Sequence, residues 1–223
     1  MEQLDSRYDK IKNIRLVRHA ESAANAGQAT QDHASIPLTP RGLKQAIEVA
    51  KSFSKAPQLI VASPFDKAQA TAKITAAAFS QAKFETWPVQ EFTYLEPARC
   101  VDTTVTQRKS WVDAYWLRSD PAFCDGVGAE SFSAFVARAQ SFLVYIEAHE
   151  TQDIVVFSHG QFMNAVAWLL ERKLNVLDGR AMVDWRRYEI ENNIQNCCGF
   201  SLCRKANDVV WTLGQRLSLG DFR

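Results

Sequence analysis

The stretch Ile154-Val155-Val156-Phe157-Ser158-His159-Gly160 predicts a buried strand that runs directly into a polar loop. Its first four residues are apolar, and an apolar helix is expected to follow to about Leu170. A strand made only of apolar residues has both of its faces buried. This pattern is typical of a parallel sheet that is covered by helices on both sides.

Two other segments repeat this pattern. Residues 12–17 are expected to form a strand that ends at Arg18-His19, and residues 59–62 a strand that ends at Ser63-Pro64. Strands alternate with helices along the chain, which predicts an α/β fold: a three-layer α/β/α sandwich around a mainly parallel sheet. The other expected elements are strands near 84–89, 197–204 and 208–212 and helices near 40–55, 63–79, 107–117, 130–146 and 178–185.

The size and composition are those of an ordinary globular protein. The chain has 223 residues, of which 47% are apolar and 23% charged, and such usage argues against disorder, collagen and coiled coil. No repeat or linker is visible, so we expect a single domain over 1–223, with the irregular stretch of about 91–128 as a lid or insertion. The net charge of +1 provides no overall field for nucleic acid or a membrane surface, and we expect neither as a partner.

The N-terminal decapeptide MEQLDSRYDK lacks the apolar region of a secretory signal. No run approaches about 18 apolar residues, so no segment is expected to span a bilayer. The five cysteines are an odd number without a signal peptide, which indicates reduced thiols and a cytoplasmic location. No Cys-x-x-Cys or regular His/Cys spacing suggests a metal, and we expect no cofactor.

Charged and proton-donating side chains follow three of the predicted strands. Arg18 and His19 follow the first, Ser63 the second and His159 the third, and Lys67 lies one helical turn past Ser63. Because ligands of parallel sheets bind beyond the carboxyl ends of the strands, we expect these groups to meet at one edge. Such a pocket, with no obvious carboxylate, would bind an anion with several acceptor oxygens, most commonly phosphate. Either histidine alone would instead be an ordinary capped or solvated residue.

The segment Arg18-His19-Ala20-Glu21-Ser22-Ala23-Ala24-Asn25 resembles the signature of the histidine phosphatase superfamily, which includes the cofactor-dependent phosphoglycerate mutases. The usual form is Arg-His-Gly with an asparagine a few residues on, and Ala20 stands here for the glycine. Further segments resemble the family's motifs in its order along nearly the whole chain: 37–42 with Gln45-Ala46, 63–72, Glu130-Ser131 with Arg138, 158–160, and Asn196 with the following strand. The resemblance implies a phosphoglycerate mutase-like fold.

The resemblance also implies roles for individual residues. His19 would be the nucleophile that carries the phosphoryl group, because a neutral imidazole is nucleophilic near pH 7. Arg18, Asn25, Lys67 and His159 would bind the phosphate oxygens, with His159 donating from its ring. Lys67 stands where the family has arginine, and lysine keeps the charge but loses the planar fork. This departure suggests a weakened or specialised enzyme, or a lysine that supplies enough charge by itself.

The family takes its general acid, a glutamate, from the segment after the third strand, near a leucine. Tyr94-Leu95-Glu96 fits this description, so Glu96 is the expected acid. Glu91 and Asp102 remain the alternatives, because the Gly-x-Trp-x-Gly element that usually follows the acid is missing.

The activity implied is that of a phosphatase that hydrolyses phosphate monoesters, small or protein-bound, through a phosphohistidine. Two alternatives stay open: mutase-type phosphoryl transfer on phosphoglycerate, and a catalytically weak protein that binds phosphate esters. Pro97-Ala98-Arg99-Cys100 does not resemble the Tyr-Gly element of the mutases, which favours the phosphatase.

The expected lid combines basic and aromatic residues, namely Arg99, Arg108, Lys109 and Arg118 with Trp111, Tyr115 and Trp116. Bases among aromatic side chains would receive a phosphorylated, partly apolar molecule. The same pattern is also that of one packed amphipathic helix, and the sequence does not separate the two interpretations.

Overall fold

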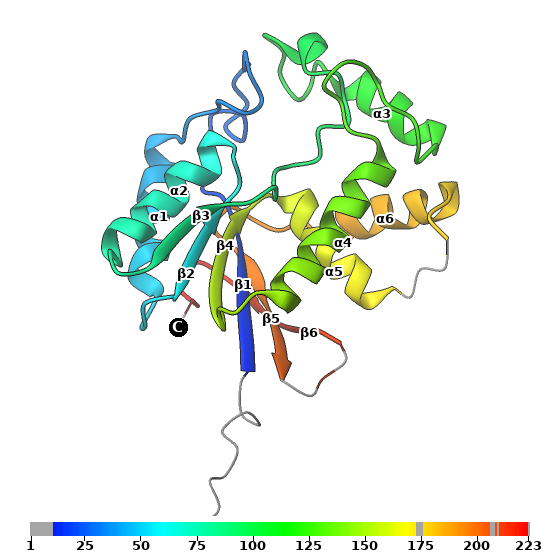
Figure 1. Cartoon of the computed structure of the whole chain (residues 1–223). Coiled ribbons are helices and arrows are strands. Elements are labelled where there is room, and N and C mark those ends of the chain that lie inside the picture. The colour runs from blue at the N-terminus through cyan, green and yellow to red at the C-terminus, as the bar shows by residue number, and fades with distance from the viewer. Residues whose placement is uncertain (1–10, 173–175, 206–207, 209, 223) are drawn as a thin grey trace, which may run out of the picture.

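The computed structural model describes residues 11–172, 176–205, 208 and 210–222 and contains one mixed sheet (Figure 1). Its six strands lie in the order β3-β2-β4-β1-β5-β6. Their bounds are Ile11–Arg18 for β1, Leu59–Ala62 for β2, Lys83–Thr86 for β3, Asp153–Ser158 for β4, Gly199–Lys205 for β5 and Thr212–Leu217 for β6. The first four in this order are parallel, whereas β5 is antiparallel to both β1 and β6. The sheet is therefore mainly parallel, as predicted.

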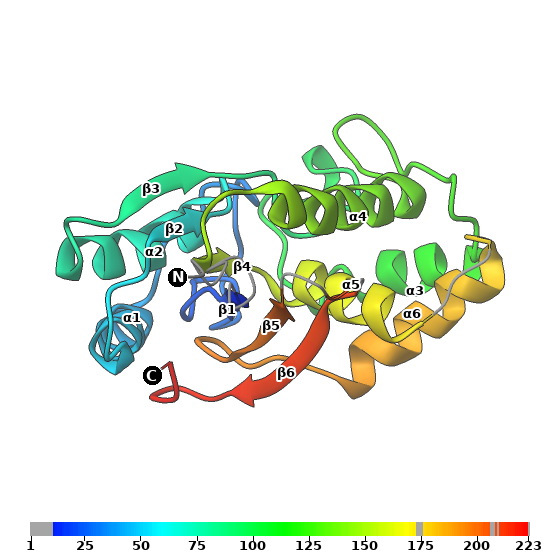
Figure 2. The same cartoon turned by 60° about the horizontal axis from the view of Figure 1, so that its bottom comes forward.

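Helices cover both faces of the sheet (Figure 2). α1 (Pro40–Ser52) and α2 (Asp66–Ala78) lie on one side. On the other side lie α4 (Phe132–Ala148), α5 (Gly160–Glu171) and α6 (Gly179–Glu191). Successive residues of β1 belong to different cores: Leu16 packs with the second group of helices and Val17 with the first. This alternation gives the three layers that the apolar strands predict.

The pairing register aligns the carboxyl ends of the central strands. Arg18, the last residue of β1, lies opposite Ser158, the last residue of β4. Ala62, at the end of β2, lies opposite Phe157 of β4. The residues that follow these strands therefore begin at the same edge of the sheet.

The segment 87–131, which contains the short helix η1 (Ala98–Cys100) and α3 (Lys109–Arg118), lies beyond this edge (Figure 1). Aromatic stacking attaches it to the helices below. The ring of Phe92 stacks on that of Phe135 in α4 with centroids 4.3 Å apart, and Trp116 stacks on Trp185 of α6 at 5.5 Å. The apolar side of α3 is thus packed, as the amphipathic-helix interpretation expects.

Several element boundaries differ from the prediction: α1 ends at Ser52 rather than near 55, and α2 begins at Asp66 rather than at 63. β3 ends at Thr86 rather than near 89, because the carbonyls of residues 88–90 bond to side chains of other elements instead of a neighbouring strand. α6 continues to Glu191 because Trp185 and Tyr188 extend its buried side. The last strand occupies 212–217, whereas 208–212 was expected.

Part of that expected strand, at residue 209, lies outside the described residues, as does the N-terminal decapeptide. Within the described part of the chain, no helix combines the length and the apolar character needed to cross a bilayer.

Gly199 is required where β5 meets β1. A methyl group at this position would overlap the carbonyl oxygen of Leu16 in the neighbouring backbone. We expect Gly199→Ala to lower the free energy of unfolding by about 1–3 kcal/mol, the usual cost of overpacking, measured by urea denaturation. Gly160→Ala is the control, because a methyl group there would make an ordinary contact of 3.7 Å with Arg18. Equal stability of the two variants would contradict the close approach.

Candidate active site

Two histidines lie side by side at the carboxyl edge of the sheet. His19 follows β1 and His159 follows β4, and their ring centroids are 5.0 Å apart with planes inclined by 56°. The register of the two strands and a backbone hydrogen bond from the amide of His19 to the carbonyl of Ser158 (2.9 Å) determine this proximity. The sequence predicted that these rings would meet, and the structure brings them together.

The His19 side chain is almost completely buried, with 2% exposure. Its Nδ1 lies 2.7 Å from the carbonyl oxygen of Ala20. A carbonyl only accepts, so Nδ1 carries the proton and Nε2 has the free lone pair. Burial lowers the pKa of His19 well below its ordinary value of 6.5, and the positive charges of Lys67 and Arg18 lower it further. The ring is therefore neutral at pH 7.

His159 is fully buried and its Nε2 lies 2.8 Å from the hydroxyl of Ser63, the residue that follows β2. That hydroxyl accepts from the amide of Phe65 (3.2 Å) and has a proton and a second lone pair left, so it can donate to Nε2 or accept from it. The other ring nitrogen, Nδ1, has no hydrogen-bond partner among the described residues. Burial is the main cause that lowers the pKa of His159, followed by the charge of His19 when protonated.

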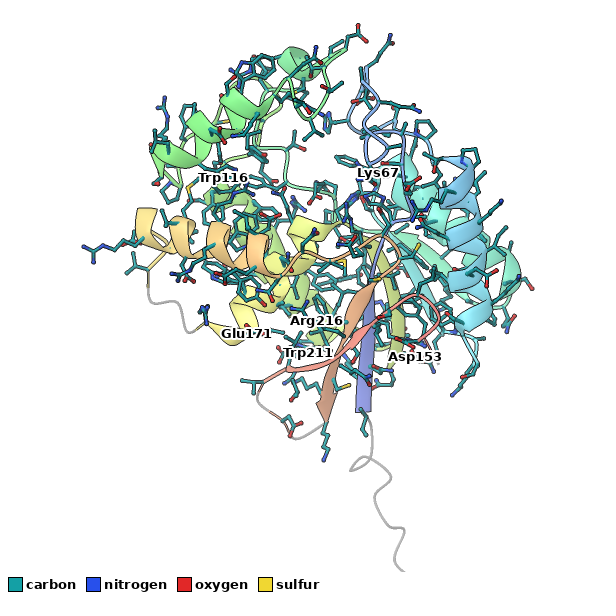
Figure 3. The ribbon with its side chains drawn as sticks, turned by 180° about the vertical axis from the view of Figure 1, so that it is seen from behind. Lys67, Trp116, Asp153, Glu171, Trp211 and Arg216 are labelled. Carbon is teal, nitrogen blue, oxygen red and sulfur yellow. The ribbon has the colours of Figure 1, made fainter. Side chains whose placement is uncertain are left out.

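Two cations accompany the histidines. Arg18 ends β1, and its Nη1 donates to the carbonyl of Ile194 (2.6 Å) in the turn before β5. Lys67, in the first turn of α2, is 9% exposed and lies over the ring of Phe65 at 5.6 Å. Figure 3 shows Lys67 at the carboxyl edge of the sheet, facing the chain that leads to α3. Burial lowers the pKa of Lys67, and the carboxylate of Glu91 opposes this shift.

The carboxyl group that shares this environment is that of Glu91. Burial raises the pKa of Glu91, whereas the charges of Lys67 and Arg18 lower it. Its Oε1 accepts from the backbone amide of Gln161 (3.1 Å) in the first turn of α5. Glu91 lines the same cavity as Lys67. A partly buried acid beside two cations is the arrangement expected of a group that exchanges a proton at an anion site.

Side chains from other elements hold the backbone before Glu91. Arg138 of α4 donates from Nη1 to the carbonyls of Pro88 (3.2 Å) and Gln90 (2.9 Å). Its Nε and Nη2 form a two-point ion pair with Glu130 at 2.9 and 2.7 Å. The hydroxyl of Ser158 donates to the carbonyl of Val89 at 2.6 Å. The Glu130 and Arg138 motif therefore positions Glu91 rather than contacting the histidines.

Glu96, the acid expected from the sequence, lies elsewhere. Its backbone amide donates to Asp125 (2.9 Å), and its carboxyl carbon lies next to Gly126. Leu95 and Pro97 line the cavity, but Glu96 does not, because its side chain points to the opposite side of the chain. Asp102 is exposed in a left-handed turn. The structure places Glu91, which the sequence analysis kept as an alternative, at the cavity beside Lys67, and Glu96 outside the lining of that cavity.

Asn25 lies at the rim of the site, and its side chain is exposed. Its Oδ1 accepts from the amide and hydroxyl of Ser22 (3.2 and 3.1 Å) and from Nδ2 of Asn196 (3.1 Å). The same Asn196 nitrogen donates to the carbonyl of His19 at 2.8 Å. Asn196 thus links the loop of Asn25 to the backbone of His19, which its place in the sequence motif did not reveal.

A cavity of about 240 Å³ opens beside Lys67 and Glu91. Its other walls come from the loop after β1, the start of α2, the segment 87–131 and the first turn of α5, which contribute His33, Phe65, Phe92, Thr93, Tyr94, Leu95, Pro97, Cys100, Val105, Arg108, Val112 and Gln161. The described residues contain no cluster of three or more His, Cys, Asp or Glu side chains suited to hold a metal ion.

Comparison with known proteins identifies relatives of this chain. A curated relative in Hydrogenobacter thermophilus, named "Putative phosphoserine phosphatase 2", is 27% identical over 161 residues, which are 72% of this chain and 79% of that protein. The alpha-ribazole phosphatase from Shigella flexneri superposes with a TM-score of 0.70 at 21% identity, covering 92% of this chain and 96% of that chain.

The phosphoserine phosphatase from Entamoeba histolytica, solved in complex with 3-phosphoglyceric acid, also gives a TM-score of 0.70 at 21% identity. It covers 95% of this chain and 100% of that chain. These solved structures share the predicted three-layer fold. The model of the histidine phosphatase superfamily (branch 1) matches residues 14–193. Because this match extends from β1 to the end of α6 and includes both histidines of the site, the chain belongs to the histidine phosphatase superfamily.

Proposed function

We propose that this protein hydrolyses phosphate monoesters, with His19 as the residue that carries the phosphoryl group. The observation that carries the proposal is the pair of neutral imidazoles 5.0 Å apart, accompanied by Arg18 and Lys67. The phosphatase names of the relatives from three organisms support the same class of reaction.

In the first step, the lone pair of His19 Nε2 attacks phosphorus, and the bond from phosphorus to the ester oxygen breaks. The hydrogen bond from Nδ1 to the carbonyl of Ala20 supports this assignment, since it leaves Nε2 unprotonated and aimed away from its own backbone. The low pKa of His19 supports it further, because a protonated ring has no lone pair to donate.

The negative charge on the phosphoryl oxygens is balanced by fixed donors. Arg18 offers a guanidinium, Lys67 an ammonium and His159 a ring N–H, and all three belong to elements that end or begin at the sheet edge. Such preorganised donors stabilise a phosphoryl transition state without proton transfer. Asn25 completes the expected set through its Nδ2, since its Oδ1 is occupied by Ser22 and Asn196.

Glu91 is the proposed acid. It protonates the departing alkoxide, and the resulting carboxylate then takes a proton from the water that attacks the phosphohistidine. Free phosphate leaves, His19 is regenerated, and Glu91 is again protonated. Its raised pKa supports this role, because an acid near neutral pH has to retain its proton until the ester bond breaks.

The nucleophile is tested by turnover of 4-nitrophenyl phosphate. We expect His19→Ala to abolish release of nitrophenol, because no other residue replaces the attacking nitrogen. The control is His149→Ala, which removes a histidine at the end of α4 outside the site and should retain full turnover. Wild-type protein that binds phosphate esters without hydrolysing them would contradict the proposal and favour a binding protein.

The acid is tested by comparing a poor leaving group with a good one. We expect Glu91→Gln to lower kcat about 100-fold or more on an alkyl phosphate, but far less on 4-nitrophenyl phosphate, whose leaving group needs no proton. Glu96→Gln is the matched control and should change neither rate more than twofold. Equal losses on both esters in Glu91→Gln would remove this residue from the acid role.

The pH dependence of kcat/KM tests Lys67. Because burial lowers the pKa of Lys67, its charge is lost at a lower pH than that of an ordinary lysine. With 4-nitrophenyl phosphate, whose leaving group needs no proton from Glu91, activity should fall as the pH rises through the lowered pKa of Lys67. Burial raises the pKa of Tyr94, and it raises that of Cys197 to about 12, so both side chains lose their protons at a higher pH than usual.

We expect Lys67→Arg to retain activity and to move the alkaline loss to higher pH, since arginine stays protonated. Lys67→Met should lose activity at every pH. An unchanged alkaline limb in Lys67→Arg would show that a different group titrates there.

A further inference from the structure

The walls of the cavity beside Lys67 and Glu91 are mainly apolar. The apolar lining residues include Phe65, Phe92, Leu95, Pro97, Val105 and Val112. Val105 is 62% exposed although it stands at this cavity. Its side chain is therefore available to contact a ligand that enters the cavity.

The size of the cavity is sufficient for a small leaving group. Its volume of about 240 Å³ exceeds the roughly 150 Å³ that is sufficient to hold benzene in an apolar protein cavity. A single ring or a short branched chain with one small substituent therefore fits.

Arg108 adds a positive charge to this apolar surrounding. It precedes α3, is half-buried, and its Nε donates to the carbonyl of Thr104 at 3.3 Å. In the described part of the chain it makes no ion pair, whereas the adjacent Lys109 is paired with Asp113 at 2.5 Å. The positive charge of Arg108 helps to lower the pKa of Lys67. Arg108 is therefore close enough to act on a molecule whose phosphate lies at Lys67.

We propose that the substrate is a phosphate monoester of a small, largely apolar alcohol or phenol that also carries a carboxylate, and that Arg108 binds this carboxylate. The inference rests on the proposed phosphatase activity and names the substrate class of the same site. The guanidinium matches a carboxylate in two-point geometry, and the apolar walls contact the body of the leaving group.

Two other classes of leaving group fit this cavity less well. An ammonium group, as in the phosphate ester of an amino acid, would lie near the positive charges of Arg108 and Lys67. The sole acid among the described lining residues is Glu91, which the proposed reaction already uses. His33 adds no negative charge and is neutral, because burial lowers its pKa. A sugar would lose hydrogen bonds to water that valine, leucine and phenylalanine walls do not replace.

The test uses three esters that differ in one charge: 4-(carboxymethyl)phenyl phosphate, 4-ethylphenyl phosphate and 4-(2-aminoethyl)phenyl phosphate. One methylene group separates the carboxylate from the ring and two separate the ammonium from it, so the leaving groups have similar acidity. For the wild-type protein we expect kcat/KM to be about tenfold higher for the carboxylate than for the neutral ester, and lowest for the ammonium ester, as one charge-assisted hydrogen bond would give.

Arg108→Gln should bring the ratio of the carboxylate to the neutral ester close to one. Lys109→Gln makes the same change of charge at the next residue, outside the cavity lining, and should keep the wild-type ratio. Val105→Asp, at a position exposed enough to tolerate a carboxylate, should reverse the preference in favour of the ammonium ester.

Each outcome separates this inference from the proposed function. Hydrolysis of all three esters at equal kcat/KM, or a carboxylate preference that survives in Arg108→Gln, would overturn the substrate class and leave the phosphatase activity intact. Higher kcat/KM for phosphoserine or a sugar phosphate than for 4-(carboxymethyl)phenyl phosphate would also overturn it. No hydrolysis of any ester would overturn both proposals.

Discussion

The parallel pairing of β1 with β4 is the constraint on which the site depends. Because Arg18 lies opposite Ser158, the residues that follow the two strands start at the same height, and their imidazole rings come to 5.0 Å. A shift of this register by one residue would turn each strand's side chains to the other face and separate the two helical layers from their cores. The packing of the sheet thus holds the two histidines together.

The charges at this edge favour an anion. Arg18 and Lys67 are both largely buried, which lowers their pKa values. The negative charge of the partly buried Glu91 opposes this shift in both. Burying like charges near two imidazoles costs free energy, and a bound oxyanion recovers part of it. The low pKa values of His19 and His159 follow from the same burial and the same positive charges. Anion affinity and a neutral, nucleophilic imidazole therefore have one physical origin.

The segment 87–131 connects this chemistry to the substrate. Its first part carries Glu91, whose position is held by Arg138 and Ser158 through the carbonyls of residues 88–90. Its later part carries Arg108 and the apolar walls of the cavity. Among its basic and aromatic residues, Trp116 packs on Trp185 as part of the core, whereas Arg108 lines the cavity.

The sequence by itself determined the layers, the mainly parallel sheet and the meeting of His19, Ser63, His159 and Lys67, because apolar runs and strand ends are local patterns with a known geometric consequence. It did not determine which glutamate joins them. Glu91 and Glu96 lie five residues apart in an irregular segment without periodicity. The direction in which each side chain points depends on hydrogen bonds from this segment to Arg138 of α4, Ser158 of β4 and Asp125. Those partners are distant in sequence, so only the tertiary structure decided that Glu91 faces the cations and Glu96 faces away.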